Sequence, residues 1–336
     1  MSARSLPVIL YHYDASPFAT KVKNMLLAKR IPHKRVNVTM IMPRPALSEQ
    51  LGITYRKIPV LAIGNDVYCD TSLIATALER RFPASEGYGT LFPPRKGSDK
   101  ADTGVAMAVM MYWMDRVMFP LAANSLPYHK YDAEFLKDRH QWMGAPIDAK
   151  ALAAKQPQRT SALASHMTLL EQQLADDRDW LLDTTTPGLA DIAAHFVCNW
   201  VRIFRSTREV FDPKVFPKSM AWIARVSEAL DKLQKDGAAP FDPISGEEAA
   251  KLVCSSPEQP NLLRFDQTEA NRFQLQLGEP ASVAPTDSGR VPTVGKLLGL
   301  TTEEAVIETE GKAGRVHCHF PRLNFSVKTA QTAAKL

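Results

Sequence analysis

Hydroxyl and carboxylate side chains stand at two places where the sequence indicates the start of a helix. Ser16 comes directly before Pro17, and Asp70 comes directly before Thr71. A serine hydroxyl at a helix N-terminus can hydrogen-bond a bound anion, while the positive end of the helix dipole adds electrostatic support. The competing interpretation is a simple helix cap, which a serine before proline often forms without any chemistry. Tyr13 lies three residues earlier and offers a second hydroxyl.

Another candidate for chemistry is the segment His317-Cys318-His319, because a strand there would place both histidines on one face. Two imidazoles can begin a metal site, but a stable site needs three or four ligands, and no further ligand is evident nearby in the sequence. We therefore expect no bound metal. The four cysteines lie far apart along the chain and lack C-x-x-C spacing, so we expect reduced thiols instead of disulfides or a zinc knuckle.

The elements that must position Ser16 and Asp70 alternate between strand and helix. Apolar periodicity and turn residues indicate strands at 8–13, 33–38, 58–63 and 67–69 and helices at 18–30 and 73–81. A crossover helix joins the first two strands, so these strands should be parallel neighbours. We assign residues 6–83 to this α/β domain.

The chain changes character after this domain. Residues 84–98 are rich in proline and glycine and form a predicted linker. Long segments with helical periodicity follow at 99–119, 132–142, 159–176, 189–205 and 218–235. We predict an all-α bundle over residues 99–236. Partial alternation at 305–307 and 316–327 predicts that residues 237–336 form a small, partly β appendage.

Composition limits the classes of partner. The 336 residues are 45% hydrophobic and 23% charged, with a net charge of +5, and the basic residues are scattered. We therefore expect no nucleic-acid partner. No run of about 20 apolar residues is present and a signal peptide has no room before the first strand, so we expect a cytoplasmic protein without a membrane partner. The terminal Ala334-Lys335-Leu336 differs by one residue from the S-K-L peroxisomal address, which makes a peroxisomal location the alternative.

Four signatures in this chain resemble the cytosolic glutathione transferases over residues 7–235, in the family's order. They are Ser16-Pro17-Phe18 with Lys21-Val22-Lys23, similar to tau-type and omega-type transferases, then Lys57-Ile58-Pro59-Val60-Leu61, Asp70-Thr71 and Gly188-Leu189-Ala190-Asp191-Ile192. The last departs from the family's capping box, because Gly188 replaces the usual serine or threonine and leaves Asp191 without its reciprocal hydroxyl. The resemblance implies a thioredoxin-like fold for residues 6–83 and a transferase-type helical domain after it.

The resemblance also implies a glutathione site. Pro59 would follow a cis bond, which turns the backbone of Ile58 outward to pair with the cysteinyl unit of glutathione. Asp70 would hold the γ-glutamyl ammonium, and Thr71 with the helix N-terminus would hold the γ-glutamyl carboxylate. Lys57 would hold the glycyl carboxylate as a point charge.

Within the implied site, we choose Ser16 as the catalytic residue, because its hydroxyl can stabilise the glutathione thiolate. Tyr13 is the rival, since other transferase classes use a tyrosine at the end of the first strand, although we prefer to place its ring in the core. Phe18 follows in the same turn and belongs to the implied site. Serine in place of cysteine at position 16 disfavours thiol–disulfide exchange and leaves conjugation, peroxide reduction or isomerisation.

The implied function is an enzyme that uses glutathione as nucleophile on a small hydrophobic electrophile, in detoxification or secondary metabolism. One face of the methionine-rich and aromatic segment at 107–119 would border the electrophile pocket, and the rest would form core. The alternative is a non-catalytic binding or regulatory protein of the same fold, which the long C-terminal extension favours. The family also implies a homodimer, whose interface the extension could block.

Overall fold

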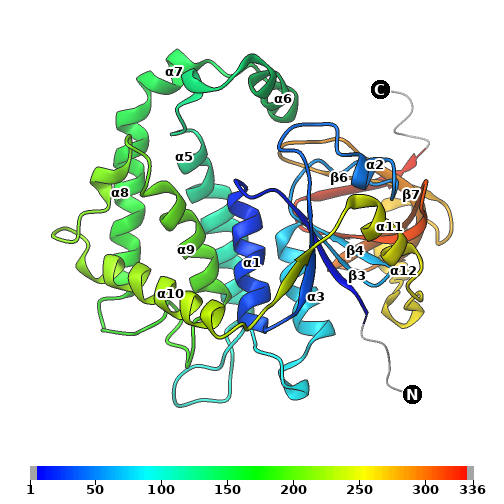
Figure 1. Ribbon diagram of the computed structural model, residues 1–336, viewed down its shortest axis with the longest axis horizontal. Coiled ribbons are helices and arrows are strands. Elements are labelled where there is room, and N and C mark those ends of the chain that lie inside the picture. The colour runs from blue at the N-terminus through cyan, green and yellow to red at the C-terminus, as the bar shows by residue number, and fades with distance from the viewer. Residues whose placement is uncertain (1–5, 331–336) are drawn as a thin grey trace.

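The structure, a computed structural model, describes residues 6–330 of the chain. Figure 1 shows a bundle of helices on one side and a strand-rich half on the other, with helix α1 (Pro17–Lys29) between them. The terminal Ala334-Lys335-Leu336 lies outside the described residues.

The N-terminal unit has the βαβ–ββα order that the sequence predicts. Its elements are β1 (Val8–His12), α1, β2 (His33–Asn37), α2 (Pro45–Ser48), β3 (Val60–Ile63), β4 (Asp66–Cys69) and α3 (Thr71–Arg81). β1 pairs in parallel with β2 and antiparallel with β3, and β3 forms a hairpin with β4. The Ile58–Pro59 peptide bond is cis, as the resemblance implies.

Side-chain caps fix where α1 and α3 begin. The Ser16 hydroxyl accepts a hydrogen bond from Ala19 N at 3.1 Å, which satisfies one of the free N–H groups at the start of α1. The Asp70 carboxylate does the same for α3 by accepting from Ser72 N at 2.9 Å. Both capping residues therefore sit at positive helix ends, where negative charge is favoured.

The helical half opens with one continuous helix built from α4 (Thr103–Ala108), the π-helical stretch η2 (Val109–Met118) and α5 (Phe119–Ala123). It continues with α6 (Ala133–Met143), α7 (Ala149–Ala154), α8 (Gln156–Gln173), α9 (Leu189–Val201) and α10 (Pro217–Lys235). Single 3₁₀ turns lie in the connections at η1 (Ala84–Glu86), η3 (Tyr128–Lys130) and η4 (Arg208–Val210). Every predicted helical segment contains a helix, and α7 is an additional one.

The continuous helix Thr103–Ala123 is long and apolar enough to cross a membrane, with a mean hydropathy of 1.2 over its most apolar window. Asp115 and Arg116 interrupt its apolar residues, which is why no unbroken apolar run stands in the sequence. In the structure, η2 packs against α9, and Met110 and Met114 are completely buried. One face of this helix therefore packs in the bundle core, and 33% of its most apolar window is buried.

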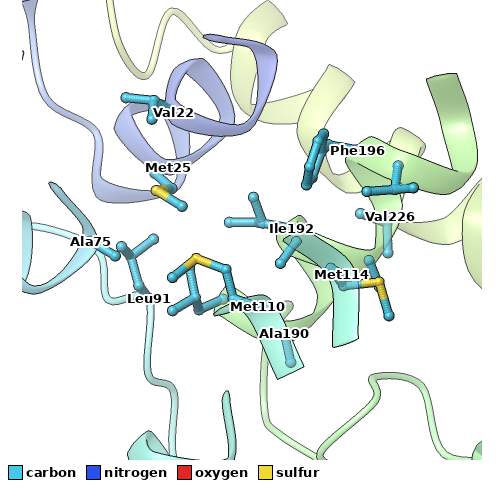
Figure 2. Close-up of a cluster of buried hydrophobic side chains, with 14 of the residues drawn as sticks. Val22, Met25, Ala75, Leu91, Met110, Met114, Ala190, Ile192, Phe196 and Val226 are labelled. Atoms are coloured by element: carbon cyan, nitrogen blue, oxygen red, sulfur yellow. The ribbon is translucent and has the colours of Figure 1, made fainter. Parts of the chain in front are cut away.

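The bundle core forms where α1, η2 and α9 meet. Figure 2 shows their apolar side chains directed toward one another, among them Val22, Met25, Met110, Met114, Ile192 and Phe196. The methionine-rich segment thus supplies mostly core, in agreement with the sequence. Met111 and Phe119 from the same helix also line the cavity described below.

Asp191 at the start of α9 has donors although Gly188 brings no hydroxyl. Its carboxylate accepts from Gly188 N at 3.0 Å, from Leu181 N at 2.9 Å and from Trp222 Nε1 at 2.8 Å. The Asp191 carboxylate thus keeps its half of the capping box through Gly188 N, and it gains an indole N–H from α10 and a backbone N–H from the preceding loop. Buried carboxylates of this kind need such donors to offset the loss of water.

The C-terminal region extends the N-terminal sheet. Its elements are β5 (Phe241–Pro243), α11 (Gly246–Cys254), η5 (Pro260–Leu262), α12 (Gln267–Phe273), β6 (Pro280–Pro285), β7 (Thr293–Leu300), β8 (Glu304–Gly311), β9 (Gly314–Pro321) and β10 (Phe325–Thr329). β9 pairs in parallel with β4, and β5 pairs in parallel with β2. One ten-stranded sheet results, in the order β10-β6-β7-β8-β9-β4-β3-β1-β2-β5.

One apolar core lies on the face of the sheet opposite to the core of the helical bundle. Residues from both ends of the chain form it. Ile9 and Val60 of the N-terminal unit share it with Leu297, Ile307 and Phe320 of the C-terminal region. The sheet also brings Cys69 Sγ to 3.7 Å from Cys318 Sγ across β4 and β9, and both cysteines are free thiols. The predicted fold class is confirmed, and its strand-rich C-terminal part is continuous with the thioredoxin-like unit.

Candidate functional site

A cavity of about 550 Å³ opens between the N-terminal unit, the helical half and two loops of the C-terminal region. Its wall contains all the site residues that the sequence indicates, namely Tyr13, Ser16, Phe18, Lys57, Ile58, Pro59, Asp70 and Thr71. These residues come from three separate turns of the chain. The fold therefore brings together every residue that the four signatures place in the site.

Ser16 is a helix cap that also lines the cavity. Its side chain is buried, and its oxygen accepts the capping hydrogen bond from Ala19 N. A hydroxyl has one proton to donate in addition to the lone pairs that accept, so the cap leaves that proton for a ligand. Because Ser16 also lines the cavity, the donor and the positive end of α1 face the same space.

Tyr13 follows the end of β1 and is half-buried in the cavity wall, with the guanidinium of Arg44 5.9 Å from the centre of its ring. Tyr11, two residues earlier, lies wholly within the core, where burial raises the pKa of its phenol far above the usual range. Tyr13 therefore has access to the cavity, as Ser16 does.

Asp70 has a left-handed backbone, with φ of 76°, and begins α3 at the cavity wall. One carboxylate oxygen accepts from the N–H of Ser72 at 2.9 Å and from its hydroxyl at 2.7 Å. The second carboxylate oxygen is thereby left for a ligand cation. Thr71 is buried beside it at the positive end of α3, where an anion would be stabilised.

Lys57, next to the cis Ile58–Pro59 bond, contacts a carboxylate of the C-terminal region. Its ammonium lies 2.6 Å from Asp287 Oδ1, and both side chains line the cavity. Burial opposes ionisation of Asp287, but the charge and hydrogen bond of Lys57 outweigh it, so the pKa of Asp287 lies below its usual range. Lys57 is therefore already paired with an anion when the cavity holds no ligand.

Arg44 is a cavity residue that sequence reasoning missed. Its guanidinium is buried and donates to the carbonyl oxygens of Thr39 at 2.9 Å and Met40 at 3.0 Å, and also to that of Arg56. Within residues 6–330 its charge has no carboxylate within ion-pair distance. Arg44 therefore adds a positive charge to the wall beside the Arg56–Lys57 peptide. The only sequence signal is its place in a proline-rich loop, which says nothing of the cavity.

Lys21 and Asp115 form a second missed feature, a buried ion pair between α1 and η2. Lys21 Nζ lies 2.8 and 2.7 Å from the two carboxylate oxygens, and its side chain has no exposed surface. Burial lowers the pKa of Lys21 and raises that of Asp115 to about 6, while their mutual attraction opposes both shifts. Asp115 also lines the cavity, so this pair links the bundle core to the site.

Aromatic side chains from the helical half form another part of the cavity wall. α5, α6, α9 and the turns next to them contribute Phe119, Tyr128, Tyr131, Phe135, Trp142, Trp200 and Phe204. Phe119 stacks on Trp200 with ring centres 5.6 Å apart, and Tyr131 stacks on Phe135 at 4.4 Å. The cavity thus has a polar end at the two helix N-termini and an apolar, aromatic end that suits a hydrophobic molecule.

The two histidines of β9 serve the sheet junction. His319 is completely buried and lies 3.1 Å from Asp66 Oδ1 and 3.3 Å from Glu304 Oε2. Burial would lower the pKa of His319, but these two carboxylates outweigh it and raise the pKa. In the described part of the chain, His317 lies near two carboxylates, Glu258 and Glu308, and the possible ligand atoms of these three residues are within 4.8 Å of one another. No local spacing in the sequence indicates this group.

Comparison with known proteins shows which domain families and solved structures this chain is similar to. The family model for the glutathione S-transferase N-terminal domain matches residues 10–86, and a model described as a domain of unknown function (DUF7962) matches residues 119–235. A GST-like protein from Pseudomonas syringae is 27% identical with a TM-score of 0.65, and the alignment covers 96% of this chain and 99% of that one. Residues 10–86 are of the glutathione S-transferase N-terminal type, and the fold of the whole chain is glutathione transferase-like. No curated protein matches it.

The similarity of this chain to the Pseudomonas syringae protein extends over the C-terminal region as well, because nearly the whole of both chains is aligned. A rice GST, solved in complex with glutathione, is 20% identical with a TM-score of 0.50 and covers 74% of this chain and 96% of its own. That similarity shows the fold alone.

Proposed function

We propose that this protein is an enzyme of the glutathione transferase superfamily that uses the thiolate of glutathione as nucleophile on a small hydrophobic electrophile, for conjugation or isomerisation. The observation that carries the proposal is one cavity with two unlike ends. At one end the Ser16 hydroxyl and two helix N-termini converge, and at the other end aromatic rings form the wall. A charged thiol peptide and an apolar reactant would each find a matching surface there.

The chemistry requires the thiolate, because a free thiol with a pKa of about 8.5 is largely protonated at neutral pH. A hydrogen bond from Ser16 and the positive end of α1 would favour the ionised sulfur. The sulfur then forms a bond to the electrophilic carbon. In conjugation a leaving group departs or the adduct takes up a proton, and in isomerisation the sulfur is expelled again.

The residues present fit the rest of the tripeptide. Asp70 retains one carboxylate oxygen for the γ-glutamyl ammonium, and the N-terminus of α3 with Thr71 suits the γ-glutamyl carboxylate. Ile58 stands before the cis bond, where its backbone can pair with the cysteinyl unit. The buried charge of Arg44 supports an anion near Lys57, in keeping with a glycyl carboxylate at this end.

The alternative is a non-catalytic protein of the same fold that binds or regulates. The observation in its favour is that Asp287, from the C-terminal region, occupies the ammonium of Lys57 inside the cavity. We place the protein in the cytoplasm, with a peroxisomal location through Ala334-Lys335-Leu336 as the alternative, and in detoxification or secondary metabolism. A homodimer is the proposed assembly.

Titration calorimetry with glutathione tests the proposal. Asp70→Asn keeps a capping oxygen and a residue type that tolerates positive φ, but it removes the charge expected to hold the γ-glutamyl ammonium. We expect the wild-type protein to bind glutathione saturably and Asp70→Asn to bind roughly tenfold or more weakly, the loss typical of a buried charge-assisted hydrogen bond. Asp266→Asn is the matched control, because Asp266 caps α12 in the same way and lies outside the cavity wall.

A wild-type protein that shows no glutathione binding would overturn the proposal. Equal affinities in the wild type and Asp70→Asn would move the γ-glutamyl unit away from α3. A thermal melt of each variant shows whether lost affinity reflects lost folding. Turnover of an aromatic halide by the wild-type protein then separates the enzyme from the binding protein.

A further inference from the structure

The loop between β6 and β7, residues 286–292, forms part of the cavity wall although it belongs to the C-terminal region. Asp287 and Ser288 line the cavity from this loop. Thr286 N donates to Asn324 O at 2.9 Å, and Thr54 Oγ1 donates to Pro292 O at 2.7 Å. The loop is therefore held at its start by the C-terminal region and at its end by the N-terminal unit.

The loop also contacts α6 at a point that requires glycine. Gly289 N donates to Trp142 O at 2.8 Å, and the backbone of Gly289 is left-handed with φ of +64°. A Cβ at this position would lie 2.8 Å from the Trp142 indole ring. The close approach fixes the loop against α6, so that Asp287 is presented to the cavity from a fastened backbone.

The partner of Asp287 is Lys57. Lys57 Nζ lies 2.6 Å from Asp287 Oδ1, and the side chain of Asp287 is 40% exposed while that of Lys57 is 21% exposed. Asp287 is ionised at neutral pH, so the pair has no net charge. An anion that approaches Lys57 must share its ammonium with Asp287 and meets the negative charge of Asp287 at the same time.

Asp287 and Asp70 line the same cavity. Tyr55, another residue of the wall, is buried, and burial together with the charges of Asp70 and Asp287 raises the pKa of its phenol. Arg116 is exposed on η2, and its positive charge stabilises the ionised form of Asp287. The loop thus adds a fixed negative charge to the polar end of the cavity.

We propose that Asp287 is a specificity-determining residue that reduces the preference of the thiol site for a free C-terminal carboxylate. This inference rests on the proposed function, because it concerns the glycyl end of the same thiol peptide. Lys57 is neutralised by Asp287, and Arg44 and Arg116 remain as cations in the cavity wall. The site then accepts a γ-glutamylcysteinyl thiol whose third unit is uncharged nearly as well as it accepts glutathione.

Calorimetric titration of the full-length protein with two probes tests this inference. The probes are glutathione and its glycinamide form, which lacks only the negative charge at the glycyl end. We expect Asp287→Asn to bind glutathione about three- to fivefold more tightly than the wild type does, the size typical of a partly exposed ion pair. Binding of the glycinamide form should change little.

Glu49→Gln is the matched control. It removes one carboxylate and breaks the ion pair between Glu49 and Lys312, which joins the N-terminal unit to the C-terminal region outside the cavity wall. We expect its affinity for both probes to equal that of the wild type. A thermal melt of Asp287→Asn checks that the loop has not unfolded the sheet.

Three results would overturn the inference. Unchanged or weaker glutathione binding by Asp287→Asn would show that Asp287 does not oppose the glycyl carboxylate. An equal gain for both probes would assign the effect to a loosened loop. A wild-type protein and an Asp287→Asn variant that both bind neither probe would overturn the proposed function itself, a result distinct from the first two.

Discussion

The Ser16 hydroxyl accepts the capping hydrogen bond from Ala19 N and still has a proton for the cavity. A substitution at this position therefore changes the stability of α1 and the environment of the thiol together. The two effects can be separated, because glycine replaces a serine cap at a cost of a few tenths of a kcal/mol, whereas alanine costs about 1 kcal/mol.

We expect Ser16→Gly and Ser16→Ala to lose turnover of an electrophile to the same extent, roughly a hundredfold, as for a single donor to a reacting anion. Their stabilities should differ, with the alanine variant less stable in a urea titration. Steady-state kinetics at saturating glutathione measure the first effect. Turnover that survives in both variants would transfer the role to Tyr13, and Tyr13→Phe would then abolish it.

At the residue scale, the sequence predicts site residues whose signals are local. Ser16 and Asp70 are caps, and a cap is defined by the few residues that follow it. Asp115 and Asp287 carry no such signal, because their partners Lys21 and Lys57 lie 94 and 230 residues away along the chain. Only the folded chain brings these charges together.

At the element scale, the ion pair between Lys21 and Asp115 joins α1 to η2, and the Lys21 side chain has no exposed surface. Removing one member of such a pair leaves a buried charge without compensation. Replacing both members by apolar residues of similar size removes the desolvation cost along with the attraction.

We expect Lys21→Met to lower the free energy of unfolding by about 3–5 kcal/mol, because Asp115 would lose its counter-charge. The double variant Lys21→Met with Asp115→Leu should recover most of this loss. Chemical denaturation of the two variants and the wild type measures both values. A double variant as unstable as Lys21→Met would show that the pair contributes more than its own electrostatics.

Local periodicity predicts the helices and strands themselves, but it does not predict which strands pair with one another. The hairpin β3–β4 is predicted because a Gly64-Asn65 turn connects its strands. The alternation in residues 316–327 indicates strands, and these form β9 and β10. β9 and β4 lie about 250 residues apart along the chain, and their pairing depends on how the two strand edges match. Periodicity along the sequence does not predict which edges pair.

At the scale of the whole molecule, buried histidines set the response to acid. His12, His33 and His195 lie in different parts of the structure, and burial is the main cause that lowers the pKa of each to about 4. His33 must be neutral to accept from Arg35 Nε at 2.9 Å. In the unfolded chain these groups titrate near pH 6.5.

We expect stability to fall as the pH decreases from about 6.5 to 4, because the unfolded chain binds protons there that the folded chain does not. His319 has a raised pKa, so its contribution is complete below pH 6.5 and does not oppose this fall. Thermal melts across this range measure the effect. Asp115 offsets part of this fall, because its pKa of about 6 lets the folded chain bind a proton over the same range. His33→Gln removes one of the three histidine contributions and should therefore reduce the slope. A slope unchanged in His33→Gln would contradict the assignment.

The order of the strands in the sheet has a consequence for biosynthesis. β4 and β2 obtain their outer neighbours from β9 (Gly314–Pro321) and β5 (Phe241–Pro243), which a ribosome releases long after the N-terminal unit. Until then the nascent chain presents two open strand edges, and open edges pair readily with other chains. We therefore expect the newly made N-terminal unit to stay open to strand pairing with other chains until the last hundred residues have been translated.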